Sequence, residues 1–177
     1  MIDLHRHDDY SLFDGLGKPM ELARLAKEYG YEALSSSNHG TASGMIEHYL
    51  ACKEAGIKPV MGVEAYFMPK FQESTNRYHL CLFCKDIQGY KNLNRMLSYA
   101  NIKQFYYKPI VTFDLLEKYH NGLICTSACI AGYISSKIAN GKTEVAEKAA
   151  RKFKSIFGDD FYIEIQPYKI STPGLQE

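Results

Sequence analysis

Hydrophobic residues recur along the chain with two different spacings, which alternate from one segment to the next. Six segments have the alternation or the short apolar run that is typical of β-strands: residues 2–7, 31–36, 58–68, 78–84, 122–127 and 161–166. Six others have the wider spacing of amphipathic helices: residues 19–29, 44–55, 87–100, 112–119, 130–139 and 143–157. Because strands and helices alternate throughout, we expect an α/β fold with a largely parallel sheet, either a barrel or an open doubly wound sheet.

Glycine and proline mark several boundaries between these segments. Pro19 suits the first turn of a helix, and Gly30 and Gly56 stand where a helix ends. The aromatic residues 105–109 are expected to form a loop. No glycine-rich phosphate loop is present, because the Gly-Leu-Gly at residues 15–17 lacks a further glycine and follows no long strand, so a nucleotide cofactor is disfavoured.

Potential metal ligands stand at the ends of several predicted strands. His5 and His7 project from one face of the first strand, about 6.6 Å apart along it. Such a pair alone is more often structural than functional. His39 follows the second strand, Glu64 lies toward the end of the third and Cys129 follows the fifth. In parallel α/β folds the carboxyl ends of the strands carry the functional groups, so these side chains are expected to meet at one rim.

Two further residues join this set with different degrees of fit. Asp14, in the loop after the first strand, can reach the same rim, whereas His79 starts the fourth strand and would lie at the wrong end of a parallel sheet. An antiparallel connection between the third and fourth strands, or a shorter fourth strand, would remove that conflict. Four imidazoles, two carboxylates and one thiol exceed what one tetrahedral zinc needs, and they favour a multinuclear hydrolytic centre. The candidate ligands are His5, His7, Asp14, His39, Glu64, His79 and Cys129.

Other histidines and cysteines are weaker candidates. Cys81 and Cys84 have the spacing of a zinc knuckle or a redox pair, but no second pair matches them and their segment is typical of a buried strand. His48 and His120 fall on predicted helices without other ligands nearby, and we expect both at the surface. A nucleophilic cysteine–histidine site at Cys129 is an alternative, although the other ligands make a metal centre the simpler interpretation.

The composition is that of an ordinary globular domain. The chain has 177 residues, which suits one domain, and its 21 Lys+Arg against 20 Asp+Glu lack the basic excess of a protein that coats DNA. Folding can still assemble a local basic patch. No apolar run approaches the roughly 18 residues of a membrane helix, and the polar start is unlike a signal peptide, so we expect a cytoplasmic protein. The five cysteines are then expected to be thiols.

Several motifs together resemble a known family. The chain opens with DLHRHDDYSLFDG and continues with SSSNHG, GIKPVMGVEAYF, YHLCLFCKDIQGYKNLNRM, FYYKPIVTFDLLEKY, GLICTSACIAGYI and IFGDDFYIEIQ. These segments resemble the PHP (polymerase and histidinol phosphatase) domain, specifically the N-terminal PHP domain of bacterial-type DNA polymerase III alpha subunits. The likeness covers essentially the whole chain. GYKNL and FYYKP are absent from the free-standing phosphatases of this superfamily.

The resemblance implies a fold and a cofactor. It implies a distorted TIM-like (β/α) barrel, incomplete at its C-terminal end, around up to three divalent transition metals: zinc, manganese or iron. The same seven residues match the family's ligand motifs. Residues 1–177 would form the N-terminal portion of the domain, without the family's last Asp-x-His motif and without the polymerase domains. One departure is Asn38, which replaces an aspartate that supports the adjacent histidine in the family.

The resemblance also implies a function. The chain would belong to a replicative DNA-directed DNA polymerase, a nucleotidyltransferase, and would act as a metal-dependent phosphoesterase with a 3′–5′ exonuclease role in proofreading. Its partners would be the 3′ end of a primer strand and other replisome subunits. Arg6 or lysines of the rim loops would hold the phosphate, and metal-activated water would be the nucleophile. Two alternatives remain open: an inert scaffold that stabilises the polymerase or docks a separate exonuclease, and a free-standing phosphatase of the histidinol phosphatase kind.

Overall fold

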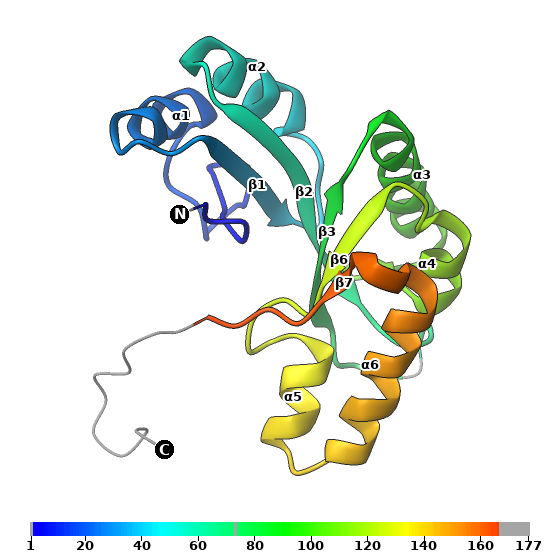
Figure 1. Cartoon of the computed structure of the whole chain (residues 1–177). Helices are drawn as coiled ribbons and strands as arrows, with labels where there is room; N and C mark the ends of the chain where they lie inside the picture. Colours follow the sequence, from blue (N-terminus) through cyan, green and yellow to red (C-terminus); the bar gives the residue numbers. More distant parts are fainter. Residues whose placement is uncertain (1, 73, 167–177) are drawn as a thin grey trace.

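The computed structural model describes residues 2–72 and 74–166, which form a mixed α/β fold with helices packed against a sheet (Figure 1). The strands are β1 (Ala33–His39), β2 (Lys58–Phe67), β3 (Tyr78–Cys84), β4 (Phe105–Tyr106), β5 (Lys108–Val111), β6 (Leu123–Thr126) and β7 (Phe161–Tyr162). The helices are α1 (Pro19–Glu28), α2 (Met45–Ala55), α3 (Ile87–Lys103), α4 (Phe113–Tyr119), α5 (Tyr133–Ala139) and α6 (Thr143–Phe157), followed by the 3₁₀ turn η1 (Gly158–Asp160). No helix within the described residues is long and apolar enough to cross a membrane.

The sheet is mixed rather than largely parallel. Its strand order is β4-β5-β2-β3-β6-β7, and β1 also pairs with β2. β1 and β5 run parallel to β2, and β7 runs parallel to β6, as expected for an alternating chain. β3, however, is antiparallel to both β2 and β6, and β4 is antiparallel to β5. The expectation of an α/β fold is therefore confirmed, while the expectation of a largely parallel sheet holds only in part.

Residues 2–7 do not form the predicted first strand. Their backbone runs beside the free edge of β1, where the amide of Ser37 donates to the carbonyl of Arg6 at 2.8 Å. The hydroxyl of Ser37 donates to the same Arg6 oxygen, and the hydroxyl of Ser35 donates to the oxygen of Leu4. Serine side chains thus stand in for part of the backbone ladder, and the segment stays extended without being a regular strand.

The other deviations lie in the second half of the chain. The aromatic residues 105–109, expected as a loop, form the short β4–β5 hairpin, with Tyr106 paired to Lys108. The predicted strand at 161–166 is shorter than expected, because only Phe161 and Tyr162 pair with β6. All six predicted helices are present.

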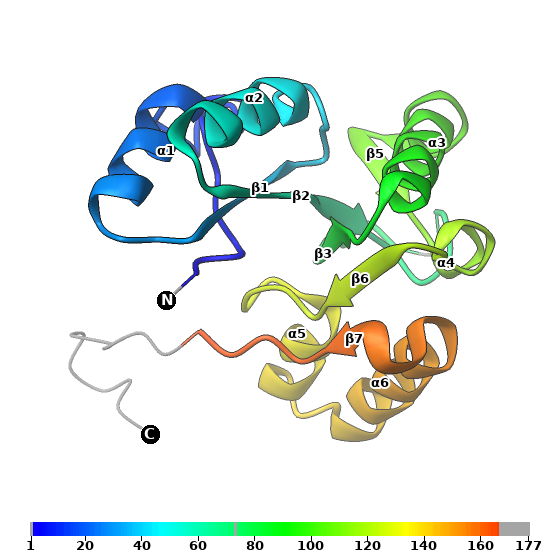
Figure 2. The same cartoon turned by 45° about the horizontal axis from the view of Figure 1, so that its top comes forward.

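Two apolar cores lie on the outside of the sheet. The larger core packs α3, α4, α5 and α6 against the sheet, with Phe67 of β2 and Phe153 of α6 near its centre. A smaller core joins α1 and α2 to β1 through residues that include Ala23 and Ala51. Figure 2 shows the two groups of helices on separate parts of the sheet. The inner face of the sheet carries a third, small apolar cluster around Cys81 and Phe83. Beside it lie the polar residues described next.

Candidate metal centre

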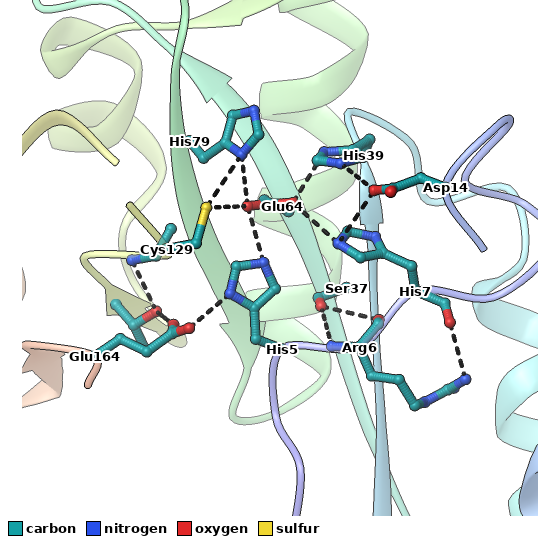
Figure 3. A network of polar contacts seen from close by, with 12 residues as sticks. His5, Arg6, His7, Asp14, Ser37, His39, Glu64, His79, Cys129 and Glu164 are labelled. Atoms are coloured by element: carbon teal, nitrogen blue, oxygen red, sulfur yellow. Dashed lines mark hydrogen bonds and ion pairs between the residues drawn. The ribbon is translucent and has the colours of Figure 1, made fainter. Parts of the chain in front are cut away.

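Glu64 is the hub of a cluster of polar side chains on the inner face of the sheet (Figure 3). Its side chain has no solvent exposure, although it is a carboxylate. Four imidazoles surround it, and their nearest nitrogens lie 2.8 Å (His5), 3.1 Å (His7), 2.9 Å (His39) and 2.8 Å (His79) from its oxygens. A buried carboxylate is stable only with charged or hydrogen-bonding partners, and here nearly all of them are imidazoles.

Strand pairing brings three of these residues together. His39 ends β1 and is in register with Glu64 of the parallel strand β2. β3 is antiparallel to β2, so its first residues lie beside the end of β2, and His79 pairs with Tyr66. The reversed direction of β3 therefore removes the conflict that the sequence raised over His79. Alternation along β2 and β3 directs Glu64 and His79 to the same face.

The loop after β6 carries Cys129 into the cluster. The Cys129 sulfur lies 3.6 Å from Nδ1 of His79 and 3.7 Å from Oε1 of Glu64. Ala128 just before it adopts a left-handed backbone, with a φ of 57°. Gly132 closes the loop by donating its amide to the carbonyl of Cys129, and a Cβ at Gly132 would lie 2.1 Å from the Ser127 oxygen. This close approach requires glycine.

Asp14 reaches the cluster from the loop after the N-terminal segment. One of its oxygens lies 2.7 Å from Nε2 of His39 and 3.9 Å from Nε2 of His7. The loop folds back tightly, because a Cβ at Gly15 would lie 1.8 Å from the backbone oxygen of Asp8. The Asp14 side chain is about half exposed, at 52%, so it faces the open side of the centre. The structure thus brings all seven predicted residues into one cluster.

Glu164 is not among the residues predicted from the sequence, and it joins the same cluster from the segment after β7. Its carboxylate lies 2.6 Å from Nδ1 of His5 and accepts hydrogen bonds from the hydroxyl of Thr126 and the amide of Gln166. Its position was detectable in principle: Glu164 and Gln166 are the polar residues of an alternating segment, so they share a face. Cys81 is buried as expected for a core thiol, but its sulfur also lies near His5 and Glu164.

A buried network behind His7 fixes the tautomer of that imidazole. The Ser11 hydroxyl donates to Oδ1 of Asn38, so its oxygen is left to accept from Nδ1 of His7 at 2.9 Å. The amide nitrogen of Asn38 in turn donates to the buried carboxylate of Asp8 at 2.6 Å. Because Nδ1 of His7 donates to Ser11, its Nε2 is the nitrogen that faces Glu64 and that would bind a metal ion.

This network also revises the expectation for Asn38. Its side chain contacts Asp8, Ser11 and Ser36 rather than the imidazole of His39. The neutral residue at position 38 lies against a fully buried carboxylate at position 8. A second carboxylate at position 38 would repel the first, so the amide is the residue that fits this site.

Arg6 does not face the centre and is unsuited to hold a phosphate there. Its guanidinium donates to the backbone oxygens of Ser35 and His7, and it lies 3.9 Å from a carboxylate oxygen of Asp8. Figure 3 shows its side chain directed away from Glu64. Burial lowers the pKa of Arg6, with the charge of Asp8 opposing that shift. The expectation that Arg6 binds phosphate is therefore wrong.

His48 is buried, contrary to the expectation of a surface position. Its Nε2 lies 3.1 Å from the backbone oxygen of Leu34, which pairs the ring inside the smaller core. Burial, helped by the charge of Arg6, lowers its pKa to about 4 and keeps the ring neutral. His120 is half-buried at the end of α4, where Nδ1 contacts the Glu117 carbonyl. Neither histidine belongs to the cluster.

The electrostatics of the cluster are those of a carboxylate held among cations. Burial alone would raise the pKa of Glu64, but hydrogen bonds from the surrounding histidines outweigh burial and lower it. For His79 the balance is reversed: burial lowers the pKa, and hydrogen bonds to Cys129 and Glu64 raise it to about 9. The pKa of His5 is also raised. Burial opposes this shift, and hydrogen bonds to Cys81, Glu164 and Glu64 cause it. The lowered pKa of Glu64 and the raised pKa values of His5 and His79 thus share a cause, which is the hydrogen bonds between these groups.

The donor set fits metal ions. Oε2 of Glu64 and Nδ1 of His39 are buried and have no hydrogen-bond partner among the described residues, although they lie 2.9 Å apart. Four overlapping groups of three donors have all their ligand atoms within 4.8 Å of one another. These groups are His5/His7/Glu64, His7/Asp14/His39, His39/Glu64/His79 and His5/Cys81/Glu164. Imidazole, carboxylate and thiolate donors at such spacing suit divalent metal ions.

The fold and this cluster define the class of the protein: an α/β domain whose sheet presents a histidine- and carboxylate-rich centre. Within that class, the chain belongs to the PHP domain family, whose model matches residues 3–168. The sequence resemblance to this family is therefore confirmed.

Curated relatives of the chain are DNA polymerase III alpha subunits. It is 41% identical to the DNA polymerase III subunit alpha of Aquifex aeolicus (strain VF5), over 96% of this chain and 16% of the relative. It is 42% identical to the subunit of the same name from Borreliella burgdorferi, over 98% of this chain and 16% of the relative. The chain thus spans about one sixth of the length of these relatives.

Solved structures resemble the chain more distantly. A crystal structure described as a metal-dependent phosphoesterase from Bifidobacterium adolescentis covers 94% of this chain, with 59% of its own length, at 20% identity and a TM-score of 0.44. An amidohydrolase from Chromobacterium violaceum covers 56% of this chain, with 32% of its own length, at 25% identity and the same TM-score.

Proposed function

We propose that this chain is the metal-dependent phosphoesterase domain of a replicative DNA polymerase and removes nucleotides from DNA 3′ ends. The observation that carries the proposal is the surrounding of buried Glu64 by four imidazoles, with its Oε2 lacking a hydrogen-bond partner in the described chain. A carboxylate placed in this way is typical of a residue that bridges or shares metal ions.

The residues that would hold the ions are the seven predicted from the sequence together with Glu164. They supply nitrogen, oxygen and sulfur donors for up to three divalent transition metals, for which zinc, manganese and iron are the candidates. When bound, such ions supply Lewis-acid stabilisation of a phosphoryl oxygen and lower the pKa of water.

The protein's own contribution is to orient these ligands. Ser11 holds the proton of His7 on Nδ1, so that Nε2 faces the centre without rotating. Glu164 accepts from Thr126 and so holds a carboxylate against Nδ1 of His5. Asp14 is the most exposed of the acidic ligands and lies on the side from which a substrate would enter. Complete burial of Glu64 keeps water from competing for its oxygens.

The DNA substrate and the replisome partners are inferred from the relatives. The named subunits of Aquifex aeolicus and Borreliella burgdorferi are DNA polymerase III subunits, and the match covers nearly all of this chain. A phosphoesterase centre within such a polymerase would act as a 3′–5′ exonuclease on the primer strand, and other replisome subunits would contact the surrounding polymerase. Proofreading is the role that fits this combination.

We also infer that the sheet curves into a distorted barrel. An open groove of about 840 Å³ lies under His5, lined by apolar side chains that include Val60, Phe83 and Ile124 of β2, β3 and β6. The N-terminal segment and the residues after β7 line its two sides. Apolar lining on the inner face of three neighbouring strands is typical of a barrel interior.

Elemental analysis of the purified chain tests the metal centre. We expect about two or three transition-metal ions per chain, and their loss in a His5→Ala/His7→Ala variant. His120→Ala is the matched control, because this histidine lies outside the cluster and should leave the metal content unchanged.

Hydrolysis then tests the activity. The metal-loaded chain is incubated with a 3′-labelled single-stranded oligonucleotide, and the release of mononucleotides is followed with and without a chelator. Release that disappears with the chelator and in the double variant supports the proposal. A chain that binds metal but releases nothing, also when it is part of the intact polymerase, would favour the scaffold alternative.

A further inference from the structure

Some basic residues of the described chain are paired with carboxylates and others are not, and two exposed residues of the second kind lie near the metal centre. Arg24, Lys85, Arg151, Lys152 and Lys154 each form an ion pair with a carboxylate. Arg77 and Lys108 form no such pair within the described residues, and both are exposed. They are the last residues before β3 and the first of β5, so they flank the end of β2. Their charge is available to an anion from solution.

Aromatic rings, rather than carboxylates, accompany both cations. The Arg77 guanidinium lies 5.7 Å from the ring centroid of Tyr107 and 6.0 Å from that of Tyr106. The Lys108 ammonium lies 5.4 Å from the ring centroid of Tyr66. Distances near 6 Å are those of cation–π contacts, which orient the cation without neutralising its charge.

Tyr66 connects this group to the metal centre. Its ring stacks beside His39 and meets His79 edge-on, with a centroid distance of 5.7 Å in both cases. Gly40, which follows His39 with a φ of 63°, makes room for it, because a Cβ there would lie 3.0 Å from the Tyr66 ring. One face of the site is therefore built from Lys108, Tyr66 and two candidate metal ligands in succession.

Tyr107 has the most unusual backbone of the group. It forms the tip of the β4–β5 hairpin with a φ of 57°, a left-handed conformation that favours glycine or asparagine. Its side chain is nevertheless large and is 75% exposed. Neither burial nor backbone preference favours tyrosine here, so this position is a candidate for a functional role.

The combination of exposed rings and unpaired cations is specific in its chemistry. Single-stranded nucleic acid offers bases that stack on aromatic side chains and phosphates that attract Lys and Arg. Each of these features has its counterpart here: Tyr107 for a base, and Arg77 and Lys108 for phosphates. A small phosphate ester would need the cations but not an exposed ring beyond them.

We infer that Tyr66, Arg77, Tyr106, Tyr107 and Lys108 form a cationic–aromatic rim that binds a single-stranded oligonucleotide and leads its 3′ end to the metal centre. The inference rests on the proposed function and adds the form of its substrate: an unpaired strand longer than one nucleotide.

Binding without metal tests the rim separately from hydrolysis. Fluorescence anisotropy of a labelled oligodeoxythymidylate is measured with the full chain in chelator, where no phosphoester is cleaved. Arg77→Ala/Lys108→Ala should weaken binding and lower the slope of log affinity against log salt by about 1.4, the value for two phosphate contacts on a single strand. Tyr107→Ala should weaken binding about tenfold, and Tyr107→Phe should retain it, because stacking needs only the ring.

Matched controls use the same residue types elsewhere. Lys118 lies 5.2 Å from the Tyr119 ring on α4, so Lys118→Ala removes an equivalent cation–π contact away from the rim. Arg95→Ala removes an exposed arginine of α3. Both variants should bind like the parent chain. Lys108→Arg keeps the charge and should restore binding, which separates loss of contact from loss of folding.

Three outcomes would overturn the inference. One is an affinity that is equal in the parent chain and the rim variants, and another is a parent chain that binds no single strand. The third is competition by inorganic phosphate that equals competition by the oligonucleotide at the same phosphate concentration, which would reduce the rim to a simple anion site. Failure of hydrolysis with rim-dependent binding intact would contradict the proposed function alone.

Discussion

The two faces of the β2–β3 pair carry different kinds of side chain, although both faces are built by the same alternating backbone. On the outer face, Val63 is paired with Leu82 and Phe67 with Tyr78, and these side chains are buried in the larger core. On the inner face, Glu64 is paired with Cys81. The outer face is satisfied by contacts within the chain, whereas the inner face gathers ionisable groups whose charges depend on what binds there.

This difference separates stability that is independent of metal from stability that depends on it. Outer-face side chains contribute through burial and packing, which are insensitive to metal and only weakly sensitive to pH. Inner-face side chains contribute through charge, which protons or metal ions can supply. Added metal should therefore change the stability of inner-face variants and outer-face variants differently, although the substituted residues are neighbours in the chain.

The largest effect is expected for Phe67→Ala on the outer face. The Phe67 ring is fully buried and packs against Phe113 and Phe153, with centroid distances of 5.0 and 5.3 Å. Its removal should lower the free energy of unfolding by about 3–5 kcal/mol. Urea denaturation with metal and with chelator should give the same loss, and Phe67→Leu should give a smaller one. A loss that depends on metal would show that the two faces are not independent.

Glu64→Gln tests the inner face. Metal at about one hundred times its dissociation constant should stabilise the parent chain by about 2.7 kcal/mol, and this increment should be absent from the variant, because the shared carboxylate is gone. Thermal denaturation with and without added zinc or manganese measures it. Glu117→Gln, at an exposed position on α4, is the matched control and should keep the full increment. If Glu64→Gln kept the stabilisation by metal, Glu64 would not be a metal ligand.

The pH dependence should have opposite signs with and without metal. In the folded, metal-free chain the pKa of His79 is raised to about 9, above its ordinary value of 6.5. Its contribution is therefore fully present below pH 6.5 and is lost as the pH rises through 9. Because solvent screens this partly exposed ring, we expect the loss to be about 2 kcal/mol, below the full value for the shift. Metal binding requires neutral imidazoles, so the stabilisation by metal should grow over the same range. Denaturation curves from pH 6 to pH 9 in chelator and in metal check both trends.

His79→Gln separates His79 from the other histidines in that experiment. The variant keeps a hydrogen-bonding side chain but cannot gain a proton, so its metal-free stability should fall less steeply between pH 6.5 and pH 9. Equal slopes in the parent chain and the variant would assign the pH dependence to another group.

The sequence was informative about what alternation and strand ends determine, and less so about the edges of the fold. Hydrophobic spacing predicted all six helices, and strand ends predicted the gathering of His39, Glu64 and Cys129 at one rim. The direction of β3 was open, because pairing depends on long-range contacts that a local pattern does not encode. Residues 2–7 have a strand-like pattern, but serine hydroxyls of β1 take part of the ladder's place. Glu164 was missed because its partners, His5 and Thr126, are distant in sequence.

The smallest effect is expected behind the centre, for Asn38→Asp. The substitution would place a second carboxylate where Asn38 now donates to buried Asp8 at 2.6 Å. One of the two acids must then take up a proton, so the variant should lose about 1–2 kcal/mol at pH 7. The loss should shrink as the pH falls, since protonation of one carboxylate restores a donor between them. Urea denaturation at pH 5 and pH 8 measures the difference.

The double variant Asp8→Asn/Asn38→Asp exchanges the two residues. It shows whether one carboxylate and one amide stabilise this site whichever position each occupies. In the double variant an amide again faces a carboxylate, so most of the lost stability should return. An oxygen at position 38 can still accept from the Ser11 hydroxyl, which leaves the Ser11 oxygen free to hold the proton of His7 on Nδ1. If the double variant is no more stable than Asn38→Asp, the loss comes from the surroundings of position 38, such as the contact with Ser36, rather than from the pair of charges.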